Sequence, residues 1–139
     1  MIWQDVVIFD KLTSEQIIRC LAGALTLDDD QIRICYNIED FPESNNAIVV
    51  CVVTEHMHGF RLTLSLYVYS ELYRDDLNFH GFVRRFARLS QTDCLVANSS
   101  PDPYLMTLIY PSGDSCEVSI NIEFIDNDNE YHVVDYVKR

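Results

Sequence analysis

The sequence is poor in glycine and proline, with four of each among its 139 residues. Four glycines can hardly build the glycine-rich loops that hold phosphates or dinucleotides, and no such fingerprint is present. No repeat, low-complexity tract or Pro/Gly/Ser-rich linker divides the chain. We therefore expect a single domain over residues 1-139, a length sufficient to bury a hydrophobic core of its own.

Positive charge is also scarce, because 10 Lys and Arg residues stand against 22 Asp and Glu residues and leave a formal net charge of -12. A chain of this sign repels phosphate backbones and anionic lipids, so we expect neither nucleic acid nor a membrane as its partner. No apolar run approaches the roughly 20 residues of a membrane-spanning helix. The excess charge either only keeps the protein soluble or attracts a cationic protein.

No closely spaced cysteine pair occurs, since Cys20, Cys35, Cys51, Cys94 and Cys116 are widely separated. An odd number of cysteines without the spacing of a disulfide framework predicts reduced and mostly buried thiols. The opening residues lack a basic segment followed by a long apolar stretch, which a secretory signal would need. We therefore expect a cytoplasmic protein.

Two helices are predicted from apolar residues that recur with the helical period. The first runs over 13–25, where Thr13 can cap the helix and Gln16 can complete a capping box. Its apolar face is formed by Ile17, Ile18, Leu21 and Leu25. The second is predicted over 75–90, with Asp75 and Asp76 placed to complement the helix dipole.

Strands are predicted where apolar and polar residues alternate or where a short run is wholly apolar. These segments are 32–36, 47–54, 60–69, 94–97, 104–110, 115–125 and 131–137. The turn Pro111-Ser112-Gly113-Asp114 predicts a hairpin between the fifth and sixth of them. Most strands bury a single face, and the connections are too short for regular βαβ units. We predict an α+β fold with two layers, a mainly antiparallel sheet of six or seven strands and two helices on one face.

Residues that could carry chemistry are sparse. Glu55-His56-Met57-His58 offers two imidazoles, but two ligands do not make a zinc site, and a strand end beside Gly59 explains them. The stretch 126–130 resembles the start of a calcium loop, yet Tyr131 replaces its glycine and Val137 its final glutamate. None of the cysteines has the electropositive surroundings of a nucleophile. We expect no enzyme activity, no metal and no cofactor, although an active site assembled from distant residues stays open.

The acidic residues gather where predicted elements end, and two tyrosines project from a polar sheet face. Tyrosine is favoured at binding hot spots because it combines a large contact area with a hydroxyl group. An acidic rim around aromatic anchors suits a complex with a basic protein. The residues predicted to contact such a partner are Asp28, Asp29, Asp30, Glu39, Asp40, Tyr67, Tyr69, Asp75, Asp76, Asp126, Asp128 and Glu130.

Taken over its whole length, the chain resembles the small acidic immunity proteins of bacterial toxin–immunity systems, including those of contact-dependent growth inhibition. The resemblance lies in the capped first helix, the acidic link at Asp28-Asp29-Asp30, the strand pair within 47–69, the second helix and the C-terminal meander. It implies an inhibitor that covers the active site or substrate groove of a cognate, basic toxin, often a nuclease. Two alternatives are a type III secretion chaperone, although such chaperones usually finish with a helix, and an enzyme without a recognisable motif.

Overall fold

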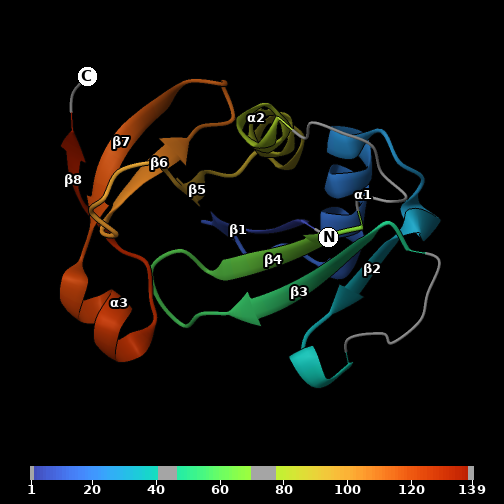
Figure 1. Ribbon diagram of the computed structural model, residues 1–139, viewed down its shortest axis with the longest axis horizontal. Helices are drawn as coiled ribbons and strands as arrows, with labels where there is room; N and C mark the ends of the chain where they lie inside the picture. Colours follow the sequence, from blue (N-terminus) through green and yellow to red (C-terminus); the bar gives the residue numbers. More distant parts are fainter. Residues whose placement is uncertain (1, 41–46, 70–77, 138–139) are drawn as a thin grey trace.

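The computed structural model describes residues 2–40, 47–69 and 78–137, which form eight strands and three α-helices (Figure 1). The α-helices are α1 (Ser14–Leu25), α2 (Phe79–Ser90) and α3 (Ile122–Asp128), and two short 3-10 helices are η1 (Asp29–Gln31) and η2 (Ile38–Asp40). The strands are β1 (Ile2–Ile8), β2 (Ile32–Cys35), β3 (Val49–Glu55), β4 (Leu62–Val68), β5 (Cys94–Ala97), β6 (Leu105–Ile109), β7 (Ser115–Ile120) and β8 (Val133–Val137).

All eight strands belong to one sheet in the order β2-β3-β4-β1-β5-β6-β7-β8. Only β2 and β3 run parallel, and every other neighbouring pair is antiparallel. The α+β class and the mainly antiparallel sheet are therefore confirmed. The strand number was predicted slightly too low, because the short apolar opening of the chain forms β1 in the middle of the sheet.

Helices α1 and α2 pack together on one face of the sheet and cover its main hydrophobic core. Helix α1 has the predicted capping box, in which the Thr13 hydroxyl accepts from the backbone N–H of Gln16 and the Gln16 side chain accepts from the N–H of Thr13. Phe82 and Phe86 of α2 are among the largest fully buried side chains. Ile17, Leu21 and Leu25 of the apolar face predicted for α1 are buried, and Ile18 is partly buried against the same core.

Helix α2 begins later than the sequence predicted. Asn78 is its N-cap, with an extended backbone and a side-chain oxygen that accepts from the N–H of Gly81 at 3.0 Å. Since the cap residue lies outside the helix, Phe79 is the first residue of α2. Asp75 and Asp76, which were predicted to contact the partner, lie outside the described residues.

Residues 115–125 do not form one strand as predicted. Strand β7 ends at Ile120, and Asn121 then caps α3 by accepting a hydrogen bond from the N–H of Phe124 at 3.0 Å. The helix ends at Asn129, whose φ of 55° places it in the left-handed region. The first three residues of the acidic stretch 126–130 therefore belong to α3, and they include Asp126 and Asp128.

A second hydrophobic cluster lies on the opposite face of the sheet, around Val7, Leu95, Leu108 and Val118. Ile125 of α3, with Tyr104, Tyr131 and Val133, packs against it. In strand β1, Val6 and Ile8 point to the helix face while Val7 points to this second face. Helix α3 thus covers part of the face that α1 and α2 leave open.

The sheet has one weakly paired junction. Strand β1 pairs with β4 through seven residue pairs but with β5 only through Val7↔Leu95 and Ile8↔Cys94. Beyond these two pairs the strands diverge, and the first half of β1 has no strand partner on that side.

None of the helices within the described ranges is long and apolar enough to cross a bilayer.

Candidate functional site

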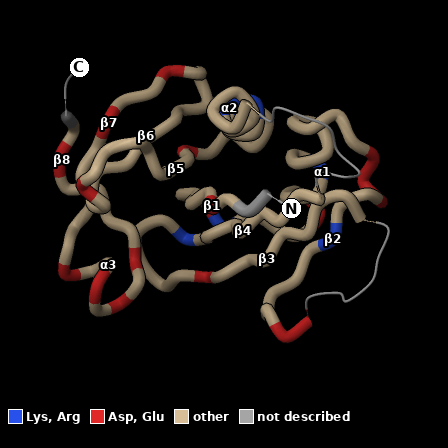
Figure 2. Tube along the Cα trace, in the orientation of Figure 1, with Lys and Arg blue, Asp and Glu red and all other residues tan. Residues whose placement is uncertain are grey.

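The acidic residues predicted from the sequence separate into two groups at opposite ends of the sheet (Figure 2). Asp28, with Asp29 and Asp30 in η1, lies beside edge strand β2, and Glu39 and Asp40 form part of η2 at the same end. Asp126 and Asp128 lie on α3 at the β7–β8 end. The structure does not join the two groups, and within the first group η1 precedes β2 while η2 follows it, so the two clusters lie at opposite ends of that strand.

Within the part of the chain that the structure describes, these carboxylates form no ion pair with a Lys or Arg side chain. Among the described residues, the only ion pair between a Lys or Arg and an Asp or Glu joins Lys11 and Glu55, at 3.3 Å and on the surface. Arg85, from the basic cluster of α2, donates instead to the carbonyl of Ala24 at 2.8 Å. Negative charge is thus left available for a ligand at both ends of the molecule.

Tyr67 and Tyr69 do not project freely as predicted. Both are half-buried and pack against a small cluster formed by Cys35, Ala47, Val50 and Val52, on the sheet face opposite α1 and α2. Part of the surface of each tyrosine ring is therefore buried within the fold, and the two side chains border this apolar cluster.

Glu130 belongs to the interior and not to the acidic rim. Its side chain is buried, and its carboxylate lies 3.2 Å from Nε2 of His132. His56, which the sequence placed at a polar strand end, is also buried, and its Nε2 lies 2.7 Å from the Thr63 hydroxyl. Burial lowers the pKa of His56, and the Glu130 carboxylate opposes this shift. His56, Thr63, Glu130 and His132 therefore form an internal polar cluster at the β3–β4 hairpin.

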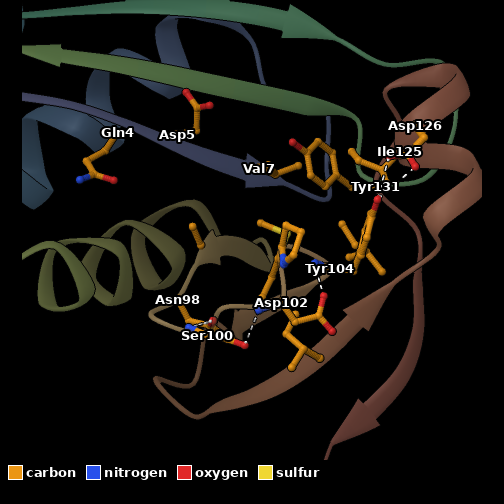
Figure 3. Close-up of a pocket in the computed structure, with 15 residues that line it drawn as sticks. Gln4, Asp5, Val7, Asn98, Ser100, Asp102, Tyr104, Ile125, Asp126 and Tyr131 are labelled. Atoms are coloured by element: carbon orange, nitrogen blue, oxygen red, sulfur yellow. Dashed lines mark hydrogen bonds between the residues drawn. The ribbon is translucent and has the colours of Figure 1, made fainter.

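A cavity of about 480 Å³ opens where β1 and β5 diverge. Its lining residues come from β1, from the β5–β6 connection and from the α3 region, as Figure 3 shows. Asp5 lies on the β1 side, Asn98 and Asp102 lie on the connection, and Tyr104 and Tyr131 close the end nearest α3. The volume falls within the range of small-ligand sites in proteins.

Two residues that line this cavity each carry a buried polar atom that has no hydrogen-bond partner and is not exposed to the cavity. These atoms are Oδ1 of Asp5 and Nδ2 of Asn98, an acceptor and a donor from segments far apart in the sequence. The orientation of the Asn98 amide is fixed, because its Oδ1 accepts from the N–H of Ser100 at 2.9 Å. A buried polar atom without a partner is costly, and such atoms call for a specific explanation in a native structure.

The electrostatic character of the cavity is negative. Asp5, Asp102 and Asp126 line it, and the residues forming its wall include no Lys, Arg or His. The Tyr104 hydroxyl donates to Asp126 at 3.1 Å, and this bond, followed by burial and the nearby carboxylates, raises the pKa of Tyr104. Burial and then the Asp5 carboxylate raise the pKa of Tyr131. Both phenols therefore experience the negative field of the cavity.

Exposed apolar side chains border the cavity on its α3 side. Ile122 and Val134 are 53% and 57% exposed, and together with Glu123 they line a shallow depression that shares Asp102 and Tyr104 with the cavity. We call the residues around this depression and the cavity mouth the α3 surface. It comprises Asp102, Tyr104, Ile122, Glu123, Asp126 and Val134.

Other chemistry within the described residues is limited. No three His, Cys, Asp or Glu side chains in residues 2–40, 47–69 and 78–137 gather closely enough to hold a metal ion. Cysteines 20, 35, 51 and 94 are buried, Cys116 is half-buried, and all five are free thiols. Burial raises the pKa of Cys51 and of Cys94 far above the ordinary range, so their nucleophilic thiolate forms are suppressed at neutral pH.

Fold and site together define an α+β protein with an acidic cavity at the junction of β1 and β5, the two central strands of a single mixed sheet. No family model, curated protein or solved structure matched the chain. Sequence analysis missed Asp5, Asn98, Tyr104 and Tyr131, because the segments that carry them become neighbours only through the strand order. The distribution of acidic residues in the sequence pointed to one lining residue, because Asp126 was among the residues predicted to contact a basic partner.

Proposed function

We propose that this chain binds a basic protein and neutralises it, as the immunity protein of a bacterial toxin–immunity system does. The observation that carries the proposal is the state of the acidic side chains. They have almost no cationic partners within the described residues, while the chain as a whole has a formal net charge of -12. A surface of this kind accelerates encounter with a cationic protein and discriminates against anionic ones.

The α3 surface is the region that best fits such an interface. Protein interfaces combine an apolar or aromatic centre with a polar rim, and Ile122 and Val134 supply exposed apolar area beside the Tyr104 ring. Asp102, Glu123 and Asp126 surround them with negative charge. The group at Asp28–Asp30 would then contribute long-range attraction and not direct contact.

Inhibition would follow from where these carboxylates sit on the partner. A nuclease or another enzyme that acts on nucleic acid must expose Lys and Arg side chains in its substrate groove. Carboxylates on a complementary surface can take the place of the phosphates and thereby block that groove. The protein would need no reaction of its own for this role.

Co-expression of the tagged chain with its neighbouring gene, followed by purification and mass spectrometry, tests the proposal. We expect a stable complex with a basic toxin domain whose activity the chain abolishes. Capture of the N-terminal segment of a secreted effector would favour the secretion chaperone instead. Turnover of a small molecule by the purified chain, without any stable partner, would contradict the proposal and favour an enzyme.

Charge reversal separates the two acidic ends. Glu123→Lys combined with Asp128→Lys should slow association with the partner by about tenfold or more at low salt, because it reverses charge on α3, in and beside the α3 surface. The matched variant Asp28→Lys, Asp29→Lys reverses the same number of charges at the opposite end and should have the smaller effect. Stopped-flow association rates would check this, with unfolding curves to show that both variants fold. Equal rates in all three proteins would contradict electrostatic attraction.

A further inference from the structure

The last strand of the sheet, β8, is paired on one side only. It ends the sheet order and forms its ladder with β7. Among the residues that the structure describes, no backbone hydrogen bond outside that ladder involves Val133–Val137. In Figure 1 no helix lies along the outer side of the strand. Backbone N–H and C=O groups on such an edge are a template for pairing with another extended chain.

The opposite edge of the sheet, β2, is less suited to such pairing. It has four residues, and the exposed cation Arg33 stands within it. Strand β8 has five residues, and its only charged residue is Asp135. It also carries Val134 and Tyr136, whose side chains are both more than half exposed. Shortness and cationic side chains are common means of keeping edge strands from pairing with other chains, and β8 relies on neither as strongly as β2 does.

The charge around β8 indicates which kind of chain it accepts. The segment 115–137, which forms β7, α3 and β8, contains six carboxylates and no Lys or Arg; the carboxylates are Glu117, Glu123, Asp126, Asp128, Glu130 and Asp135. Within the described residues, none of them lies within ion-pair distance of a Lys or Arg. Opposite charges on neighbouring strands stabilise a sheet, and like charges directly opposite each other destabilise it. A cationic strand is therefore favoured beside β8, and an anionic one is opposed.

The same charge opposes a second copy of this chain as the occupant. Two-fold antiparallel pairing of β8 centred on Asp135 would place two copies of this carboxylate opposite each other. It would also bring together two segments 115–137, each without Lys or Arg, in chains of formal net charge -12. Asp135 thus discriminates between the occupants, because it repels its own copy and attracts a cation.

The two sides of β8 differ, and this difference defines the pattern of a matching segment. Asp135 and Tyr136 follow each other in the strand, so their side chains point to opposite faces of the sheet. Tyr136 pairs with the buried Val118 of β7 and lines a cavity of about 260 Å³ together with Phe60 and Tyr131. An added strand would place an apolar residue beside Tyr136 and a Lys or Arg beside Asp135. Apolar and cationic residues would therefore alternate in it.

We propose that β8 is a docking edge for an extended segment in which Lys or Arg alternates with apolar residues, and that this segment joins the sheet as a further strand. That the segment belongs to the neutralised protein rests on the function proposed above, whereas the preference of the edge for such a segment does not. Val134 belongs to both β8 and the α3 surface, so a partner bound at that surface is already in contact with this edge.

Peptides of defined charge test the proposal on the full chain labelled with 15N. The probe is acetyl-Lys-Val-Lys-Val-Lys-Val-amide. The first control, acetyl-Glu-Val-Glu-Val-Glu-Val-amide, keeps the alternation and reverses the charge. The second control is the lysine peptide with every backbone nitrogen methylated, which keeps the charge and removes the donors that strand pairing needs. NMR titration measures binding, and amide hydrogen exchange of β8 measures pairing.

We expect the lysine peptide at saturation to slow the exchange of alternate β8 amides by about tenfold or more, because the outward N–H groups gain a partner. The glutamate peptide should bind about tenfold or more weakly, because its charge has the same sign as that of the edge. The methylated peptide should leave the exchange rates unchanged. Equal binding of the lysine and glutamate peptides, or equal protection of β8 by the methylated peptide, would overturn the proposal.

Variants locate the site within the chain. Asp135→Lys reverses the charge of the edge, so the preference for the lysine peptide should disappear. Asp30→Lys reverses one charge beside β2 at the opposite edge and should leave the preference intact. Unfolding curves show whether both variants fold, and the peptide comparison on the unmodified chain decides the matter without them. A dimer in analytical ultracentrifugation whose β8 amides are protected without any peptide would refute the proposal in favour of a second copy.

The two proposals can fail separately. Protection of β8 by the lysine peptide without capture of any basic protein would overturn the proposed function and leave the docking edge standing. Capture of a basic partner whose complex leaves the β8 amides unprotected would remove the assignment of its segment to this edge, and the proposed function would stand.

Discussion

The buried imidazole of His56 shows how a single titratable side chain links the stability of this protein to pH. It lies against Thr63 and the Tyr131 ring, and the Glu130 carboxylate is near enough to oppose the effect of burial. The net shift lowers its pKa. The folded protein therefore keeps the imidazole neutral at pH values where the unfolded chain already binds a proton.

We expect the stability that His56 contributes to be complete above its unfolded pKa of about 6.5, and to decrease as the pH falls below that value toward the folded pKa. His56→Gln removes the titrating group, so its free energy of unfolding should decline less than that of the unmodified chain between pH 7.5 and 5.5. Urea unfolding at both pH values measures the difference. His58→Gln removes an exposed imidazole from the same hairpin, and an equal effect there would contradict the assignment to His56.

At the residue scale, sequence patterns identified acidic side chains but did not predict which residues surround them in the fold. Glu130 follows a run of exposed acidic residues in the sequence, and only the position of His132 and the hairpin explains its burial. Asp5 stands in a short apolar strand, where its carboxylate gave no sign of a site. Its neighbours in the cavity, Asn98 and Tyr131, are separated from it by most of the chain. Long-range packing of this kind leaves no local pattern to detect.

At the element scale, α3 depends on its caps because it has only seven residues. Helices this short are unstable alone, so end groups and packing decide whether they form. Asn121 satisfies the N–H of Phe124, and Asn129 ends the helix in the left-handed conformation. Only Ile125 of the helix packs against the second hydrophobic cluster, so packing contributes little.

Asn121→Ala should lower the free energy of unfolding by about 0.5–2 kcal/mol, the usual cost of losing an N-cap side chain. Chemical denaturation measures this value. The matched variant Asn121→Asp keeps an acceptor at the cap and should lose much less. Equal stabilities of the Ala and Asp variants would contradict the capping role.

The same helix explains the largest error in the prediction of elements. Apolar residues continue to alternate through Ile122 and Phe124, so the period of the preceding strand extended past its real end. These two side chains are 53% and 40% exposed, and they therefore do not report a buried sheet face. Elements with a fully buried face were predicted more accurately. Helix α1 matched its capping signal, and β5 matched its predicted bounds, because burial there enforces the pattern.

At the scale of the whole molecule, unbalanced charge affects folding and association in opposite directions. Self-repulsion within a chain of formal net charge -12 opposes the compact state, and the described residues offset it with a single surface Lys–Glu pair. Added salt screens this repulsion, since the Debye length falls from about 30 Å at about 0.01 M to about 8 Å at about 0.15 M. The same screening weakens attraction to a basic partner.

We therefore expect the midpoint of thermal unfolding to rise between low and physiological NaCl while the association rate with the partner falls. Scanning calorimetry and stopped-flow mixing over the same salt series measure the two quantities. A variant in which Asp28, Asp29 and Asp30 are replaced by Asn carries less charge and should respond less to salt in both measurements. A midpoint that falls with salt would show that self-repulsion does not limit stability.

The pairing of β1 with β5 gives the sheet a seam. On one side lie β2, β3, β4 and β1, and on the other lie β5, β6, β7 and β8. Only two strand residue pairs join these four-stranded halves, with backbone hydrogen bonds from Phe9 to Asp93 and from Phe60 to Tyr131 beside them. A small rotation of one half about this seam changes the separation of Asp5 from Asn98, since each belongs to a different half. Local opening at this seam would expose the short β1–β5 ladder first, so the amide hydrogens of Val7 and Cys94 should exchange with solvent faster than those within the seven-pair ladder of β1 and β4.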